Sequence, residues 1–308
     1  MSNTCEICSS KNIIKHSYNN HLDKFNITIY LFSKTIIILI LSLFIKKYKS
    51  KNLFSAFLKV SVCKDCGYGK CLTKIRENDL KEYYNNLFWD DGKFDFFYKE
   101  SNNQIDRAEG QFKAIKNYLP NIPIKILEIG AGSATLSKIL RNNVNVIESN
   151  VVEPGNRWIE YYNSNNLKKI SDFYPDKKIL KYDLVIASHW LEHVSDIKSV
   201  LLSLRDNLNE KGLIFIEVPN CNNEYWNLDI KDIPHMYFFT KTSLKKLFSD
   251  NGFEVEYIEN LGMTNKEFYF SNNFAVLRSE LLQEINESIK NNTYRNKGNV
   301  IRMVARKL

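Results

Sequence analysis

The sequence lacks two signatures of common nucleotide-binding loops. No Gly-Lys-Ser or Gly-Lys-Thr follows its glycine-rich turn, so a loop that cradles phosphates is not expected. The third glycine of the dinucleotide fingerprint is also missing, because Thr135 stands at that position. No recognised nucleic-acid-binding motif accompanies the net charge of +8. We therefore interpret the excess lysines as a solvated surface and expect no nucleic-acid partner.

The sequence also lacks an uninterrupted apolar run that could span a membrane. Its longest run, residues 35–45, has eleven mainly apolar residues, whereas a spanning helix needs about 20. Extending the run back to residue 27 includes Lys34. We expect a buried or interfacial segment, and peripheral contact of residues 27–51 with anionic lipid stays open because lysines follow the run. With no evident signal peptide, we expect a cytoplasmic protein. Peripheral contact with lipid would make it membrane-associated.

Two C-x-x-C pairs, Cys5 with Cys8 and Cys63 with Cys66, flank that apolar segment. Without an export signal, such pairs favour a metal over disulfides, and four thiolates form the usual closed structural zinc site. A membrane span between the pairs would place them on opposite sides of the bilayer, which argues against one. We predict a zinc-binding module over residues 1–73, with free thiols as the alternative. The spare ligand candidates are Cys71, His16 and His21.

Residues 74–120 are expected to form a helical connector. An aromatic face including Tyr84, Phe88 and Trp89 precedes a helix predicted over residues 106–119 from its apolar spacing. Such faces are more often core than ligand platforms, although this one could cover a cofactor. Prolines 120 and 123 then mark the entry into a third region, residues 121–308.

Residues 124–135 have the pattern of a buried strand, a glycine turn and a helix. Glu128 precedes Gly130 and Gly132, which allow a tight turn and close approach of a ligand to the backbone. Ala134 stands where an extended glycine loop would place its last glycine. An acidic residue before the glycines suits a ligand with a cationic amino acid part.

Strands and helices alternate from residue 124 onwards, which predicts a parallel α/β sheet. A second strand ends at Glu153, where a carboxylate can hold a ribose diol. A third ends near Asp172 and Phe173, which could contact an adenine. Strands at 182–188 and 213–218 follow. Because ligands bind at the carboxyl ends of such strands, we expect several residues to converge there: Glu128, Gly130, Glu153, Ser188, His189 and Asn220.

Taken in order, these segments resemble class I S-adenosylmethionine-dependent methyltransferases. The motifs are Glu-Ile-Gly-Ala-Gly, Val-Val-Glu-Pro, Tyr-Asp-Leu-Val-Ile-Ala-Ser, Leu-Glu-His-Val and Gly-Leu-Ile-Phe-Ile-Glu-Val-Pro-Asn, and the match covers about residues 105–308. The resemblance implies a Rossmann-like seven-stranded sheet with helices on both faces, a sixth strand at 252–258 and an antiparallel seventh at 299–305. The cysteine pairs ahead of it resemble, more loosely, the zinc module of sugar C-methyltransferases, which act on nucleotide-linked deoxysugars.

The resemblance also implies roles for residues at the cofactor. Gly130 and Gly132 would pass under the methionine part of S-adenosyl-L-methionine, and Glu128 would orient its amino group. Glu153 would hold the ribose hydroxyls. The adenine would lie between Asp172 and Phe173, and Ser188 would complete the cofactor-binding set. Ala134 is small enough to replace the family's third glycine.

The transferred methyl needs an aligned acceptor and, for an oxygen or carbon acceptor, a base. His235 is our first candidate base, because an imidazole suits proton abstraction at neutral pH. Tyr237 and His189 complete the predicted catalytic set, while His193 is expected to pack beneath the site. We expect a sugar nucleotide or surface-carbohydrate precursor as substrate. The alternatives are a lipid-like acceptor at a membrane surface and a non-catalytic scaffold.

Overall fold

The computed structural model describes residues 4–18, 58–73, 75–86, 88–89, 102–175, 180–227, 235–264 and 298–308. The apolar segment at 27–45, the lysines that follow it and the aromatic residues at 94–98 lie outside these ranges. In the part of the chain that is described, no helix is long and apolar enough to cross a bilayer.

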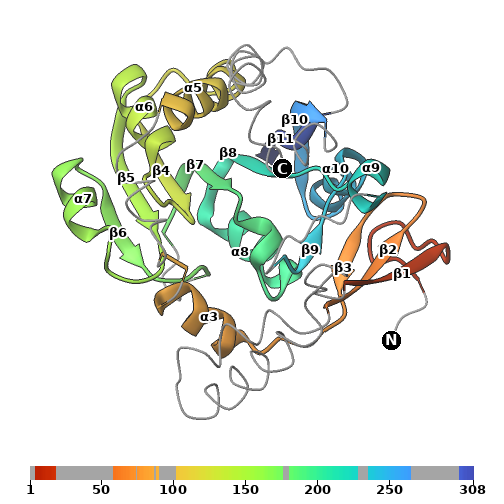
Figure 1. Cartoon of the computed structure of the whole chain (residues 1–308). Coiled ribbons are helices and arrows are strands. Elements are labelled where there is room, and N and C mark those ends of the chain that lie inside the picture. The colour runs from red at the N-terminus through yellow and green to blue at the C-terminus, as the bar shows by residue number, and fades with distance from the viewer. Residues whose placement is uncertain are drawn as a thin grey trace, which may run out of the picture.

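A seven-stranded sheet forms the larger part of the molecule (Figure 1). Its order is β10-β11-β8-β7-β4-β5-β6, and β11 runs antiparallel to both of its neighbours. The strands are β4 (Ile124–Ile129), β5 (Val146–Val152), β6 (Lys168–Ser171), β7 (Tyr182–Ser188), β8 (Leu208–Pro219), β10 (Phe253–Thr264) and β11 (Gly298–Lys307). The predicted seven-stranded α/β fold is thereby confirmed.

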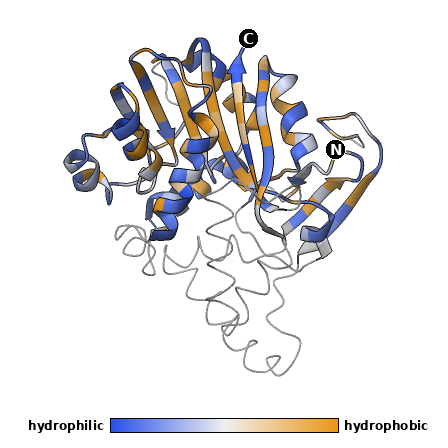
Figure 2. Cartoon of the chain, turned by 90° about the horizontal axis from the view of Figure 1, so that it is seen from above, coloured by the Kyte–Doolittle hydropathy of each residue, from blue (hydrophilic) through white to orange (hydrophobic). Residues whose placement is uncertain are grey.

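Helices cover both faces of this sheet because its central strands are apolar on both sides. In β7, Leu184 and Ile186 pack toward one face, and Val185 and Ala187 toward the other. The first face is covered by α5 (Asn102–Ile115) and α6 (Thr135–Asn143), the second by α8 (Ile197–Asn207) and α10 (Lys241–Ser249). The strands of the sheet are correspondingly rich in hydrophobic residues (Figure 2). One hydrophobic core therefore packs against each face of the sheet.

Most boundaries match the sequence prediction within a few residues, and the larger differences have local causes. The connector helix α5 begins at Asn102 and ends at Ile115, four residues earlier than predicted at each end. Strand β8 begins at Leu208 rather than at residue 213, because Leu208 already pairs with Tyr182 across a register shift. The other helical elements are α3 (Glu77–Asn86), α7 (Ile159–Ser164), η1 (Leu191–His193) and α9 (Asn223–Asn227).

A smaller antiparallel sheet joins the cysteine-containing region to the rest of the chain. Its order is β1 (Ile13–Tyr18), β2 (Leu58–Cys63), β3 (Gly69–Cys71) and β9 (Tyr237–Phe238). The amide of Cys71 donates to the carbonyl of Met236 over 2.8 Å, and the Thr240 hydroxyl donates to the carbonyl of Cys66. The region expected to be a separate module over residues 1–73 thus takes its last strand from residues that follow β8 (Figure 1).

Candidate active site

A cavity of about 690 Å³ opens at the carboxyl edge of the parallel strands. Residues that sequence analysis placed at a cofactor are brought together on its wall: Glu128, Gly130, Gly132, Glu153, Asp172, Phe173 and Ser188. His189 also lines it, whereas Asn220 is buried outside its lining. The cavity is the size expected for a small-molecule site, and it concentrates the predicted cofactor residues at one place.

The turn after β4 has a backbone that requires glycine. Gly130 has a φ of +66°, and a Cβ on it would come within 2.9 Å of the indole of Trp190. Gly132 has a φ of +48°, and a Cβ on it would lie 3.4 Å from the indole of Trp89. Ala134 closes the turn in a left-handed conformation, with φ 48° and ψ 36°. The turn therefore keeps a glycine-type backbone even where the third glycine is absent.

Glu153 stands at the tip of β5 and is 3% exposed. Its Oε2 accepts from the amide of Gly132 at 2.9 Å, and its Oε1 accepts from the indole of Trp89 at 2.8 Å. Burial raises the pKa of this carboxyl to about 7, although both donors favour its charged form. Each carboxylate oxygen has a second acceptor position, so Glu153 can still receive two hydroxyls of a diol.

Glu128, the last but one residue of β4, is buried beside the same turn. Its Oε2 accepts hydrogen bonds from both the amide and the hydroxyl of Ser137 in α6. Within the described residues Oε1 has no such partner, and the side chain lines the cavity. Burial raises the pKa of Glu128 to about 7. A bound cation at this point would bring the carboxyl back to its charged form.

Two more of the predicted cofactor contacts follow β6. Asp172 lines the cavity and is half-exposed, with its carboxylate 2.5 Å from the Lys169 ammonium. The ring of Phe173 lies 5.6 Å from the ammonium of Lys81, which comes from α3. An aromatic face and a carboxylate at this end can bind a flat heterocycle.

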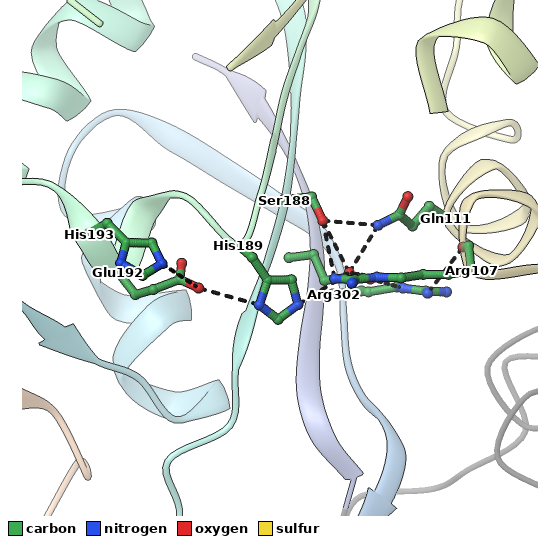
Figure 3. Close-up of polar contacts among 8 residues, drawn as sticks. Arg107, Gln111, Ser188, His189, Glu192, His193 and Arg302 are labelled. Carbon is green, nitrogen blue, oxygen red and sulfur yellow. Dashed lines mark hydrogen bonds and ion pairs between the residues drawn. The ribbon is translucent and has the colours of Figure 1, made fainter. Parts of the chain in front are cut away.

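A charged cluster that sequence analysis did not single out lies at the tips of β7 and β8 (Figure 3). Glu217 is fully buried between Arg302 of β11 and Arg107 of α5, whose Nε is 2.7 Å from Glu217 Oε1. Gln111 donates to both Ser188 Oγ, at 3.0 Å, and Glu217, at 2.9 Å. Burial alone would raise the pKa of Glu217, but the two guanidinium groups hold it well below its usual range.

A second cluster continues this row of polar groups to the other side of His189 (Figure 3). His189 Nδ1 is 3.4 Å from the carboxylate of Glu192, and His189 Nε2 is 3.7 Å from Glu217. His193 Nε2 is 3.8 Å from Glu192, and the ring of His193 lies 4.7 Å from that of His235. Burial opposes ionisation of Glu192, yet the surrounding imidazoles lower its pKa to about 2. Burial lowers the pKa of His235 to about 4.

The three predicted catalytic residues occupy different positions. His189 lines the cavity. His235 lies beside His193, outside the set of residues that line it, and is therefore behind the wall. The hydroxyl of Tyr237 donates to the carbonyl of Ser195 at 3.2 Å and accepts from the amide of Ile197 at 3.4 Å. Tyr237 thus holds the start of α8. His193, expected beneath the site, lines the cavity instead.

The four predicted zinc ligands come together from two separate turns. Their sulfur atoms all lie within 4.8 Å of one another, with Cys5 3.6 Å from Cys66 and Cys8 3.5 Å from Cys63. Four thiolates about 2.3 Å from one zinc ion would have similar separations, so the cluster fits the metal. Cys71 lies outside it and contacts the carbonyl of Thr73, and His16 stacks on Trp226. His21 lies outside the described residues.

Several residues of the site were missed because their signal in the sequence is weak. Arg107 and Gln111 occupy one face of α5 four residues apart, and only the fold brings that face to Glu217. Arg302 lies inside an apolar strand pattern. An arginine at such a position is buried only when it is paired, so it could have indicated a buried acidic partner. Glu217 lies in the Gly-Leu-Ile-Phe-Ile-Glu-Val-Pro-Asn motif, in which nothing indicates that two distant arginines pair with it.

A family model described as a methyltransferase domain matches residues 104–258, half of the chain. No curated protein matches the sequence.

Solved structures match the fold at low sequence identity. A chain of the complex between the Haloferax volcanii Trm112 methyltransferase activator and its methyltransferase is 14% identical, with a TM-score of 0.50 over 76% of this chain and 99% of that one. An S-adenosylmethionine-dependent methyltransferase of Thermotoga maritima is 15% identical, with a TM-score of 0.49 over 74% and 100%. Coclaurine N-methyltransferase bound to S-adenosylhomocysteine is 13% identical, with a TM-score of 0.49 over 73% and 82%. With half of its length matched by the family model, the chain belongs to the methyltransferase-domain family and is an S-adenosylmethionine-dependent methyltransferase.

Proposed function

We propose that the protein transfers a methyl group to a carbon or oxygen atom of a sugar nucleotide or a related carbohydrate precursor. The observation that carries this proposal is a set of polar side chains, those of Arg107, His189 and His193, on the wall of the cavity next to the cofactor residues. A lipid-like acceptor would leave these polar groups without a partner.

The order of the strands orients the cofactor in this proposal. Glu153 on β5, the glycine turn after β4 and Ser188 on β7 follow one another across the sheet. We infer that the ribose lies at Glu153, the methionine part at Glu128 and Gly130, and the acceptor beyond Ser188. Bound S-adenosyl-L-methionine supplies a methyl group on a sulfonium, which is already a good leaving group. The protein must then align the acceptor and remove its proton.

His189 is the base that the geometry favours among the three predicted candidates. It lines the cavity, and two carboxylates orient its ring, that of Glu192 at 3.4 Å from Nδ1 and that of Glu217 at 3.7 Å from Nε2. Its backbone is held in a left-handed conformation, at φ 50°, by a hydrogen bond from its amide to the carbonyl of Glu217. Tyr237 then acts as a positioning residue, through its contacts with Ser195 and Ile197.

Arg107 supports an anionic ligand. Two guanidinium groups share the single carboxylate of Glu217, so one positive charge remains, and Arg107 is the exposed member of the pair. The carboxylate of the cofactor and the diphosphate of a sugar nucleotide both fit this charge. The cysteine cluster, which fits structural zinc, is joined through β3 to β9, next to His235, and this position supports a role in shaping the acceptor side. Zinc held by reduced thiolates accords with a cytoplasmic location.

Calorimetry with S-adenosylhomocysteine, followed by transfer of labelled methyl to a panel of sugar nucleotides, tests the proposal. We expect binding in the micromolar range and labelling of at least one sugar nucleotide. His189→Asn should lower kcat while leaving the affinity for S-adenosylhomocysteine within about twofold, because the residue acts on the acceptor. Glu160→Gln, an exposed substitution on α7, is the matched control.

Each failure has a separate meaning. Binding of the cofactor without labelling of any sugar nucleotide would contradict the substrate class. An unchanged kcat in His189→Asn would contradict the base. In Arg107→Gln, weaker S-adenosylhomocysteine binding would assign the positive charge to the cofactor carboxylate, whereas a raised KM for the acceptor alone would assign it to the diphosphate.

A further inference from the structure

The second cluster has the composition of a metal site as well as of a proton-transfer site. We propose that Glu192, His193 and His235 bind a divalent transition-metal ion at the acceptor side of the cavity. This site is separate from the cysteine cluster and does not depend on the identity of the methyl acceptor. Imidazole and carboxylate ligands suit zinc, cobalt, iron and manganese, and three protein ligands leave positions open for a further ligand.

The geometry brings one ligand atom from each residue close to the others. A carboxylate oxygen of Glu192 and a ring nitrogen of each histidine all lie within 4.8 Å of one another. The two imidazole rings are 4.7 Å apart and inclined at 71°. Ligands about 2.1 Å from one ion are separated by about 3–4 Å, so small side-chain rotations would close the group around a metal.

The backbone holds the two contributing segments together. Glu192 and His193 belong to the short helix η1, and His235 directly precedes β9. The amide of Met236 donates to the carbonyl of Glu192 over 2.7 Å, which fixes the segment next to His235 against η1. The hydrogen bonds of Tyr237 with Ser195 and Ile197 attach the same segment to the residues that follow η1. A preformed arrangement of this kind lowers the entropic cost of binding an ion.

Glu192 gives the independent reason to expect a cation. Its side chain is 1% exposed, and apart from the 3.4 Å contact with His189 Nδ1 neither carboxylate oxygen has a hydrogen-bond donor among the described residues. The ion-pair partners within 4.0 Å in that part of the chain are histidines, not arginine or lysine. A buried carboxylate is costly unless a cation or hydrogen-bond donors compensate it. The imidazoles supply that charge only while they are protonated, whereas a metal ion would supply it with neutral imidazoles as fellow ligands and with His189 as an outer partner that orients the carboxylate.

The proposed ion would be accessible from the cavity. His193 lines the cavity together with Val194 and Ser195 of the same turn. Its side chain is 18% exposed, whereas that of Glu192 is buried. Open positions on the ion would therefore face the acceptor and could bind one of its oxygen atoms.

The test uses the full chain with the cysteine cluster already loaded with one equivalent of zinc. Cobalt(II) is then added and followed by calorimetry and visible absorption. We expect one further equivalent to bind in the micromolar range without the intense thiolate bands of a cysteine-bound ion. Glu192→Gln and His193→Asn should each weaken this binding at least tenfold. His16→Gln, which alters a histidine stacked on Trp226 in the small sheet, should leave it unchanged.

His235→Gln provides a third ligand variant, and retained binding of S-adenosylhomocysteine shows that each variant is folded. The proposal is overturned if the zinc-loaded native chain takes up no second ion, or if folded Glu192→Gln and His193→Asn bind cobalt as tightly as the native chain does. Because the measurement needs no methyl acceptor, its failure is distinguishable from a failure of the proposed transferase activity.

Discussion

The two halves of the cavity treat buried glutamates in opposite ways. On the cofactor side, Glu128 and Glu153 are compensated by neutral donors, and burial raises the pKa of each to about 7. On the acceptor side, Glu192 and Glu217 are just as buried but lie beside imidazole or guanidinium groups, which lower their pKa values. The same residue type therefore has a different charge state according to its cationic neighbours rather than its depth.

The difference matches the ligands that each half would receive. A carboxyl with a raised pKa and no cation of its own is suited to a ligand that brings a positive charge, as an ammonium or a sulfonium does. A carboxylate already paired with arginine or histidine instead orients those groups. We infer that the cofactor half is completed electrostatically by its ligand, whereas the acceptor half is organised before binding. The predictions below test this difference.

The largest expected effect is on the pre-organised half. Arg302→Met would leave Glu217 fully buried with one guanidinium fewer, and should lower the free energy of unfolding by about 3–5 kcal/mol. Chemical denaturation measures it. Arg306→Met, on the same strand, breaks the partly exposed pair with Glu256 and should cost at most about 1 kcal/mol. Equal losses in the two variants would show that the buried pair has no special weight.

The second effect is on ligand binding in the cofactor half. Glu153→Gln replaces two acceptor oxygens by one oxygen and one amide donor, which faces the amide of Gly132 or the indole of Trp89. We expect the affinity for S-adenosylhomocysteine to fall about 100-fold, or about 3 kcal/mol, by calorimetry. Glu160→Gln serves as the control. A loss below threefold would contradict the ribose contact.

The third effect is a pH dependence of opposite sign for binding and stability. Because the charged form of Glu153 accepts the hydroxyls, affinity for S-adenosylhomocysteine should rise about tenfold from pH 6 to pH 8, with a midpoint near 7. The raised pKa means that the folded, ligand-free protein holds protons that the unfolded chain releases above about pH 4.5. The contribution of Glu153 to stability is therefore full below pH 4.5 and lost by about pH 7.

Comparison of the native chain with Glu153→Gln isolates the contribution of Glu153 ionisation to ligand affinity and to stability. The variant should show a shallower dependence on pH in both calorimetry and denaturation, with Glu128 responsible for the part that remains. If affinity instead fell between pH 6 and pH 8, the carboxyl would bind its ligand in the protonated form, and the contrast between the two halves would fail.

The smallest effect concerns backbone strain in the cofactor half. Ala134 adopts a left-handed conformation at φ 48°, which disfavours a residue with a Cβ by about 1–2 kcal/mol. Ala134→Gly relieves this strain but increases the freedom of the unfolded chain, so we expect a net gain in stability of about 0.5 kcal/mol by thermal denaturation. Ala108→Gly in α5 should instead cost about 1 kcal/mol or more. A loss in Ala134→Gly would show that the turn is unstrained.

The fold was predictable from the sequence because its signals are local. The apolar run Ile124–Ile129, the glycines after it and the alternation of strands and helices each depend on neighbouring residues. Glu128, Glu153 and Ser188 could be placed at one edge because parallel strands end together. Strand β8 begins earlier than predicted because Leu208 pairs with Tyr182, a contact between residues that are distant in sequence.

The acceptor half depends on contacts between residues that are distant in sequence. Arg107 and Glu217 are 110 positions apart, and Arg302 is 85 positions beyond Glu217. The contact between the rings of His193 and His235 and the pairing of β3 with β9 also join residues that are distant in sequence. By itself, the sequence determined the order of the strands' motifs, the glycine turn and the carboxylates at the strand tips, because chain-local patterns encode them. Only the tertiary structure decided which buried carboxylates lie beside a cationic side chain, because that depends on which helix face or strand the folded sheet brings next to them.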